Sequence, residues 1–241
     1  MALSGSTNYN LTATKLIELA YQEIGDTPIG QGIPGELLTY GMDKLNILLK
    51  HLRNLGVHLY IRTNISFAPV NAQFKYTIGP SGANVTAPRP FNLIDAYYRK
   101  TSDKINQPLA ILTRDQYFGQ TARESTSNTS ERITQVFYDP TLTNGELYVY
   151  PIPNATAASS YTIELYVLRQ FDDIDAPSDD IQIPPHMYRA VLLQLAYDLS
   201  LPARLSMHER ATLNRDADRA LTEALDADQE ESIFLQPGSN R

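Results

Sequence analysis

The segment from Glu146 to Ser200 constrains the fold of this chain more than any other part of the sequence. It begins with two runs, 146–152 and 161–168, in which apolar and polar residues alternate. This period of two is typical of half-buried β-strands. An acidic connector broken by prolines follows, and then a helical apolar stripe that starts at Pro184. The chain must therefore combine a β region with a helix that returns from it.

Two helices are predicted ahead of the β region. The first runs from Thr12 to Ile24, with Thr12 as its N-cap and Gly25 as the residue that stops it. The second starts near Pro34 and ends before Gly56, and its apolar residues step by three and four positions. This spacing predicts a buried seam of Leu38, Met42, Leu45, Leu49 and Leu52. We expect the two helices to pack as an antiparallel pair.

Between residues 59 and 171 the pattern changes to a period of two, rich in β-branched and aromatic residues. The predicted strands are 61–67, 73–78, 91–99, 132–138, 146–152 and 161–168. A helical turn is expected from Thr113 to Phe118, and a polar loop from Gln120 to Ser130. The region therefore reads as an antiparallel β domain.

Helical spacing returns after the acidic connector. One helix is predicted from Pro184 to the Leu201-Pro202 pair, because proline is tolerated in a first turn. Another is predicted from Ser206 to Asp228, and Ser206 with Glu209 matches a capping box. Small residues on its apolar face, among them Ala217, Ala220 and Ala224, allow another helix to approach closely.

These elements predict an α+β fold, in which N-terminal and C-terminal helix pairs form one bundle, with an antiparallel β domain inserted between the pairs and an extended C-terminal tail. Each helix pair has an apolar stripe that needs a partner, and the β region cannot cover both. The expected parts are the N-terminal helical pair 1–58, the β-rich insertion 59–171, the C-terminal helical pair 172–228 and an extended tail 229–241.

Composition excludes several classes of protein. The chain has 241 residues, a formal net charge of −7 and no cysteine, so neither disulfides nor thiolate metal sites can form. An acidic chain is unsuited to wrapping DNA, because such surfaces need clustered lysine and arginine. No apolar run approaches the ~20 residues that cross a bilayer, and the first residues lack a secretory pattern. We therefore expect no membrane partner.

The motifs that suggest chemistry are incomplete. Gly30–Gly35 matches G-x-G-x-x-G, but a helix rather than a strand precedes it, which favours a flexible loop. The acidic cluster at 172–180 lacks the central glycine and terminal glutamate of a calcium loop, which favours a solvated connector. None of the four histidines forms a ligand pair on one helix face. We predict no catalytic residue, no cofactor and no metal, and hence no enzyme.

Tyrosine is abundant, with 15 residues, whereas tryptophan is absent. Tyr148, Tyr150, Tyr161 and Tyr166 alternate along predicted strands. A platform on which sugars or bases stack is one interpretation. Packing of half-buried strands is the simpler one.

The ordered motifs of the chain resemble those of one family. They are TATKLIELAYQEIG, LNILLKHLRNLGVHLY, QPLAILTRDQYFGQ, FYDPTLTNGELYVYPIP and DDIQIPPHMYRAVLLQLAYDLS. The motifs lie between residues 12 and 200, and their order and spacing resemble the gp4-like head-to-tail adaptor family of short-tailed bacteriophages, also described as packaged-DNA stabilisation or tail accessory proteins. The resemblance covers about residues 12–225.

The resemblance implies a structural protein of the virion head–tail junction, assembled in the host cytoplasm. Members of the family form a ring, commonly of twelve copies, that docks below the portal protein and receives a tail nozzle or tail tube protein. The ring extends the DNA channel and retains the packaged DNA. Double-stranded DNA then passes through the lumen without sequence-specific binding, and an acidic lumen suits that passage because like charge prevents sticking.

Two sets of residues are candidates for these contacts. The resemblance assigns portal binding to the tail, where Ile233, Phe234 and Leu235 form an apolar anchor. We expect this tail to be disordered in the free protein; the alternative is that it folds back on its own bundle. Charged residues of the second and fourth helices are candidates for the ring interface. These are Lys44, Arg53, Arg215, Asp216, Asp218, Arg219 and Glu223.

Each assignment has an alternative. The charged residues can equally form a solvated face. The whole chain can be interpreted as a virion-associated cell-wall hydrolase that uses glutamate or aspartate, or as a β-sandwich module that binds host polysaccharide. The second interpretation leaves the four long helices unexplained.

Overall fold

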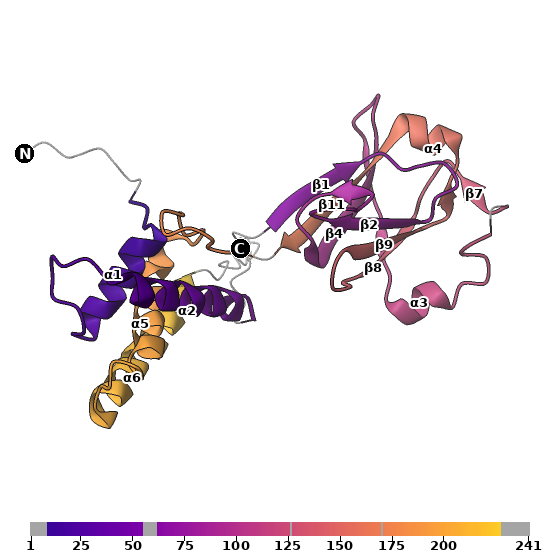
Figure 1. Ribbon diagram of the computed structural model, residues 1–241. Coiled ribbons are helices and arrows are strands. Elements are labelled where there is room, and N and C mark those ends of the chain that lie inside the picture. Colours follow the sequence, from indigo (N-terminus) through magenta and orange to yellow (C-terminus); the bar gives the residue numbers. More distant parts are fainter. Residues whose placement is uncertain (1–8, 55–61, 126, 170, 228–241) are drawn as a thin grey trace, which may run out of the picture. The chain divides into compact units, whose positions relative to one another are not determined.

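The computed structural model describes residues 9–54, 62–125, 127–169 and 171–227 (Figure 1). Within these ranges the chain forms six α-helices and eleven strands, and the long strands pair antiparallel, so the predicted α+β class is confirmed. The chain divides into two compact units. The helical unit comprises Met1–Tyr60 and Phe171–Arg241, and the β unit comprises Ile61–Gln170.

Helix α1 spans Ala13–Glu23 and has both predicted caps. The Thr12 hydroxyl accepts a hydrogen bond from the Lys15 backbone N–H at 3.3 Å, which satisfies one free first-turn donor. At the other end Gly25 has φ +72°, and the N–H groups of Gly25 and Asp26 donate to carbonyls of the last turn. This is a Schellman ending, which needs a residue that tolerates the left-handed region.

Helix α2 spans Gly35–Asn54 and begins where the sequence predicted. Leu45, Leu49 and Leu52 of the predicted seam are buried, whereas Leu38 and Met42 are only half-buried. The seam is therefore tightest in the second half of the helix. The predicted stop at residue 56 lies outside the described residues.

The helix predicted to start at Pro184 starts later. Pro184 is extended, with ψ 151°, and Pro185–Met187 forms a 3₁₀ turn before α5 spans Tyr188–Leu199. The physical reason is the second proline, because Pro185 sterically disfavours the helical conformation for Pro184. Helix α5 contacts α1 and α2 as well as α6. Helices from both ends of the sequence therefore meet on α5.

Helix α6 spans Met207–Ala227, and its predicted capping box is confirmed. Ser206 Oγ accepts from the Glu209 N–H at 3.3 Å, and the Glu209 carboxylate accepts from the Ser206 N–H at 3.0 Å. The Ser206 hydroxyl also donates to the Glu209 carboxylate at 2.6 Å, and this bond, together with the bond from the Ser206 N–H, holds the pKa of Glu209 below its usual range. Buried Ala217, Ala220 and Ala224 form the small-residue face of α6.

The β unit contains all six predicted strands, with ends that differ from the predicted ones by at most three residues. They are β1 (Arg62–Phe67), β2 (Lys75–Gly79), β4 (Pro90–Lys100), β8 (Gln135–Asp139), β9 (Gly145–Tyr150) and β11 (Tyr161–Arg169). A four-stranded sheet has the order β1-β11-β4-β5, and a five-stranded sheet has the order β3-β2-β9-β8-β6. Buried side chains from both sheets form one hydrophobic core.

The shorter elements of the β unit were not predicted, apart from α3. They are β3 (Val85–Thr86), β5 (Asn106–Pro108), β6 (Ala110–Ile111), β7 (Thr129–Ser130), β10 (Ile152–Pro153) and α4 (Ala155–Ser160). Strands of two or three residues are too short to show a period. Helix α3 (Arg114–Phe118) confirms the predicted turn, with Thr113 as its N-cap in a capping box. Asn154 caps α4 by accepting from the Ala157 N–H at 2.9 Å.

The chain enters and leaves the β unit through neighbouring strands. Residues Arg62 of β1 and Leu168 of β11 are partners in an antiparallel register. Because antiparallel partners lie side by side, the two connections to the helical unit leave from the same end of one strand pair. The returning connection continues as the acidic segment at 171–183.

Candidate assembly surfaces

The predicted ring-interface residues of α6 lie on its exposed side. Arg215 and Arg219 have side chains 77% and 79% exposed. Arg219 pairs with Glu223 at 2.8 Å, one turn along the same helix, and Arg215 lies 3.8 Å from Asp216. Exposed pairs of this kind contribute only about 0–1 kcal/mol each. They can be exchanged for contacts with another molecule at little cost.

The remaining candidates are less uniform. Asp218 of α6 accepts hydrogen bonds from Asn214 at 3.3 Å and from Gln194 of α5 at 3.4 Å. Lys44 of α2 is half-buried, and its ammonium lies 5.6 Å from the centre of the Tyr40 ring. Arg53 belongs to the last turn of α2. The structure thus places the α6 charges on one helix, while Lys44 and Arg53 lie on another.

The predicted portal anchor lies outside the described residues. Ile233, Phe234 and Leu235 follow the end of α6 at Ala227 by six to eight positions. Their docking site therefore remains a proposal.

The acidic connector, residues 171–183, is fixed to the helices by hydrogen bonds and is not a freely solvated loop. Asn46 of α2 donates to the Ile174 carbonyl at 3.0 Å and accepts from the Ile174 N–H at 2.8 Å. Lys50, one turn further along α2, pairs with Asp173. Ile174 itself is buried. The prediction of a solvated connector is thus right for the aspartates, which are mostly exposed, and wrong for the backbone between them.

The connector also caps α1. The first-turn N–H groups of Ala13 and Thr14 donate to the carbonyls of Asp179 and Pro177, at 2.9 and 3.0 Å. The Thr14 hydroxyl donates to the same Pro177 carbonyl at 2.6 Å. Helix N-termini need such acceptors because their first N–H groups have no partner within the helix. The connector therefore joins the start of α1 to the middle of α2.

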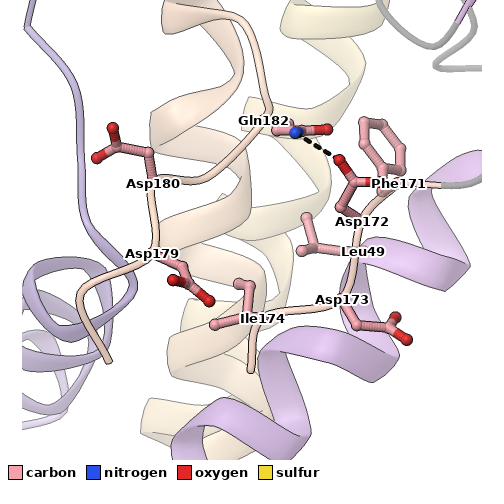
Figure 2. A pocket seen from close by; sticks show the side chains of 8 residues that line it. All are labelled: Leu49, Phe171, Asp172, Asp173, Ile174, Asp179, Asp180 and Gln182. Atoms are coloured by element: carbon pink, nitrogen blue, oxygen red, sulfur yellow. Dashed lines mark hydrogen bonds between the residues drawn. The ribbon is translucent and has the colours of Figure 1, made fainter. Parts of the chain in front are cut away.

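A polar pocket of about 250 Å³ lies along this connector (Figure 2). Gln182 donates to Asp172 at 2.6 Å across one side of it. In Figure 2 the carboxylates of Asp173 and Asp180 point away from one another. Among the described residues no group of three or more acidic, histidine or cysteine side chains is arranged to hold a metal ion.

An aromatic cluster joins α3 to strands β8 and β9 of the five-stranded sheet, and sequence reasoning missed it. Tyr117 and Phe118 of α3 pack on Phe137 and Tyr148, with ring centres 5.2–6.0 Å apart. The guanidinium of Arg123 lies 5.1 Å from the centre of the Phe118 ring. Burial raises the pKa of Tyr117 to about 12. The DQYF sequence of α3 was the available signal, since two adjacent aromatics on a short exposed helix need a surface to cover.

The strand tyrosines behave mainly as packing residues. Tyr161 stacks on Tyr98 with ring centres 4.5 Å apart, and its hydroxyl donates to the Glu131 carboxylate at 3.0 Å. Tyr148 belongs to the aromatic cluster. Tyr166 remains 41% exposed and meets Tyr97 edge to face. No row of exposed rings suited to stacking sugars or bases is present in the described ranges.

The described part of the chain also contains no helix long and apolar enough to span a bilayer.

Comparison with known proteins identifies the family. The family described as SU10 adaptor protein matches residues 41–240, which is most of the chain. The chain therefore belongs to the SU10 adaptor protein family, a phage adaptor family. No curated protein matches the chain.

Membership defines a class of function. The chain is a structural adaptor component of a phage virion, in a family whose role involves other virion components such as portal and tail proteins. Such a role suggests a non-enzymatic protein. The match supports the broader prediction of a phage adaptor. It does not extend to the finer prediction of a gp4-like adaptor of short-tailed phages.

Proposed function

We propose that this chain forms a ring, commonly of twelve copies, below the portal at the head–tail junction. The observation that carries the proposal is the adaptor-family match over residues 41–240. The motif order adds to it, because it resembles that of gp4-like adaptors of short-tailed phages. In this role the ring extends the DNA channel, helps to retain packaged DNA and gives a tail nozzle or tail tube protein its docking site. It assembles in the host cytoplasm.

The charged side of α6 is the proposed ring contact, with Lys44 and Arg53 of α2 on the neighbouring copy. Arg215 and Arg219 are highly exposed, and their present partners lie on the same helix. Exchanging a weak intrahelical pair for a contact between copies costs little, because exposed pairs are worth about 0–1 kcal/mol. The contact is therefore compatible with a protein that is monomeric until it meets the portal.

The net charge of −7 supports a lumen through which DNA moves freely. Binding to DNA depends on neutralising phosphates with lysine and arginine. An acidic chain gains little from that effect, so passing DNA is not held and no sequence is read.

The tail is the proposed portal contact. Ile233, Phe234 and Leu235 are three adjacent apolar residues in an otherwise polar segment. Apolar and aromatic anchors of this kind contribute most of the binding energy when they enter a pocket of a partner.

A reconstruction of the virion tests the ring directly. We expect density for several copies of this chain, related by rotation about the channel axis, between portal and tail. Native mass measurement of the chain with its portal should show the same stoichiometry. A single copy at the junction, or location of the chain only in fibres or in the cell-wall-degrading apparatus, would reject the ring and favour the hydrolase or glycan-binding alternatives.

A further inference from the structure

A groove runs along α6 within the helical unit and has two sections. The first section, of about 420 Å³, lies between the end of α1 and the first half of α6. Ile24, Leu205 and Leu213 provide its apolar lining. The second section, of about 290 Å³, is lined by charged residues of both signs, Arg189, Arg219, Asp216 and Glu223. Asp216 lines both sections, so they adjoin at this residue of the helix.

The two sections differ in charge. Glu23, Glu209 and Asp216 surround the apolar section. In the other section, Arg189 and Arg219 balance the acidic Asp216 and Glu223, and Arg219 is paired with Glu223. Among the described residues, Arg189 forms no ion pair. An acidic residue of a bound segment can therefore pair with Arg189 at one end of the groove, while uncharged apolar residues fit the other end.

We propose that in the free chain the groove binds the chain's own C-terminal segment, residues 228–241, which is the folded-back alternative to the disordered tail expected from the sequence. This segment has a matching order of charge. Its acidic residues come first, with Asp228, Glu230 and Glu231, and residues 232–240 contain no acidic side chain. If the segment turns back along α6, Glu230 and Glu231 lie beside Arg189 and Arg219. The apolar anchor at 233–235 then reaches the apolar section.

The lengths agree with this arrangement. A helix rises by about 1.5 Å per residue, so Arg219 lies about 12 Å and Leu213 about 21 Å back from Ala227. An extended chain spans at most about 3.3–3.6 Å per residue, so Glu231 can reach about 14 Å and Phe234 about 24 Å from Ala227. The fully extended reach exceeds these distances by only about 2–3 Å, so the segment reaches both sections only when it is almost fully extended and reverses directly after Ala227. The opposite register would set the acidic residues against Glu209 and Glu23.

Docking in the groove covers three apolar side chains that the virion assembly needs only later. Docking in the groove is a contact separate from the proposed portal contact, and it can be measured in the free chain without the portal. The segment leaves the groove when a partner offers a better site, as in any equilibrium between two binding sites.

A single tryptophan can report on the contact, because the chain has none. In Phe234→Trp we expect blue-shifted emission and slow quenching by acrylamide. Adding Leu213→Glu should shift the emission to that of an exposed indole, whereas the control Ile47→Glu, at a site 62% exposed on α2, should leave it unchanged. Circular dichroism melting would verify that each variant is folded.

A charge exchange gives a second readout that does not depend on Leu213. Arg219→Glu should speed hydrogen exchange at residues 233–235 by about tenfold, equivalent to about 1.4 kcal/mol. Adding Glu231→Arg should restore the protection. An exposed indole in Phe234→Trp, or unprotected amides at 233–235 in the wild type, would overturn the proposal. Protection that appears only as protein concentration rises would assign the groove to a neighbour's tail and would also overturn it.

Discussion

At the residue scale, Asn46 fixes the acidic connector to α2, a role that the sequence analysis assigned to no residue. It is a half-buried amide beside the buried seam of α2, and both of its polar atoms pair with the backbone of Ile174. The partner lies 128 positions away, so no local pattern can reveal it. The visible signal was only a polar residue next to Leu45 and Leu49. Residues whose role is set by distant backbone are those that sequence reasoning misses.

Replacing Asn46 with alanine should destabilise the helical unit by about 1–3 kcal/mol, because two partly buried backbone groups lose their partners. Asn214→Ala is the matched control, since Asn214 makes one long bond to exposed Asp218. Thermal melting of both variants measures the difference. Equal melting temperatures would show that water replaces the Asn46 amide without loss.

Buried Tyr76 predicts an alkaline limit to stability of the β unit. Its hydroxyl donates to the Gln73 carbonyl at 3.0 Å, and burial raises its pKa to about 12. The unfolded chain loses that proton near pH 10, whereas the folded chain keeps it, so stability falls as pH rises from about 10 towards 12. Each such tyrosine contributes up to about 1.4 kcal/mol per pH unit to that fall.

The measurement compares denaturant unfolding at pH 9 and at about pH 11. Tyr76→Phe should lose less stability over this interval than the wild type does. Tyr166→Phe is the control, because Tyr166 is 41% exposed. An unchanged pH slope in Tyr76→Phe would mean that Tyr76 titrates at its ordinary pKa.

At the element scale, prediction succeeded where a local rule is sufficient. The caps at Thr12 and Ser206 act over three residues, and each was found where the sequence places it. The start of the helix after Pro184 was wrong, because a second proline changed a favourable first turn into an extended residue. Strands of two residues such as β3 and β6 form only because the neighbouring strands β2 and β8 provide their hydrogen bonds.

The seam of α2 gives the sharpest test at this scale. Leu45→Asp places an unpaired carboxylate in a fully buried position and should cost several kcal/mol, typically more than about 3. Ile47→Asp, two residues along the same helix and 62% exposed, should cost about 0.5 kcal/mol or less. The two melting temperatures provide the comparison. A variant Leu45→Asp that melts like Ile47→Asp would show that the seam faces solvent.

At the scale of the whole molecule, the sequence indicated the class of fold and the kind of protein but left the assembly contacts open. Periodicity alone predicts which segments are helices and strands. It cannot show that the end of α1 and the start of α6, nearly two hundred positions apart, line one groove. It also cannot show contacts between copies, because surface pairs such as Arg219–Glu223 look the same in a monomer and in a ring.

The tail is proposed to bind the groove in the free chain and the portal in the virion. Its deletion therefore separates folding of the chain from attachment to the portal. Removing residues 229–241 should lower the melting temperature only by the contribution of the groove contact, because the helices and the β core retain their packing, yet it should abolish attachment to portal-bearing heads. Leu213→Glu, which alters the groove but keeps the anchor, should still attach. Because this substitution removes a competing site, the apparent affinity of the variant for heads should be equal to or higher than that of the wild type.

Co-sedimentation of each variant with purified heads measures the outcome. Attachment of the truncated chain at wild-type affinity would remove the tail from the portal contact, and failure of Leu213→Glu to attach would show that the groove itself faces the portal.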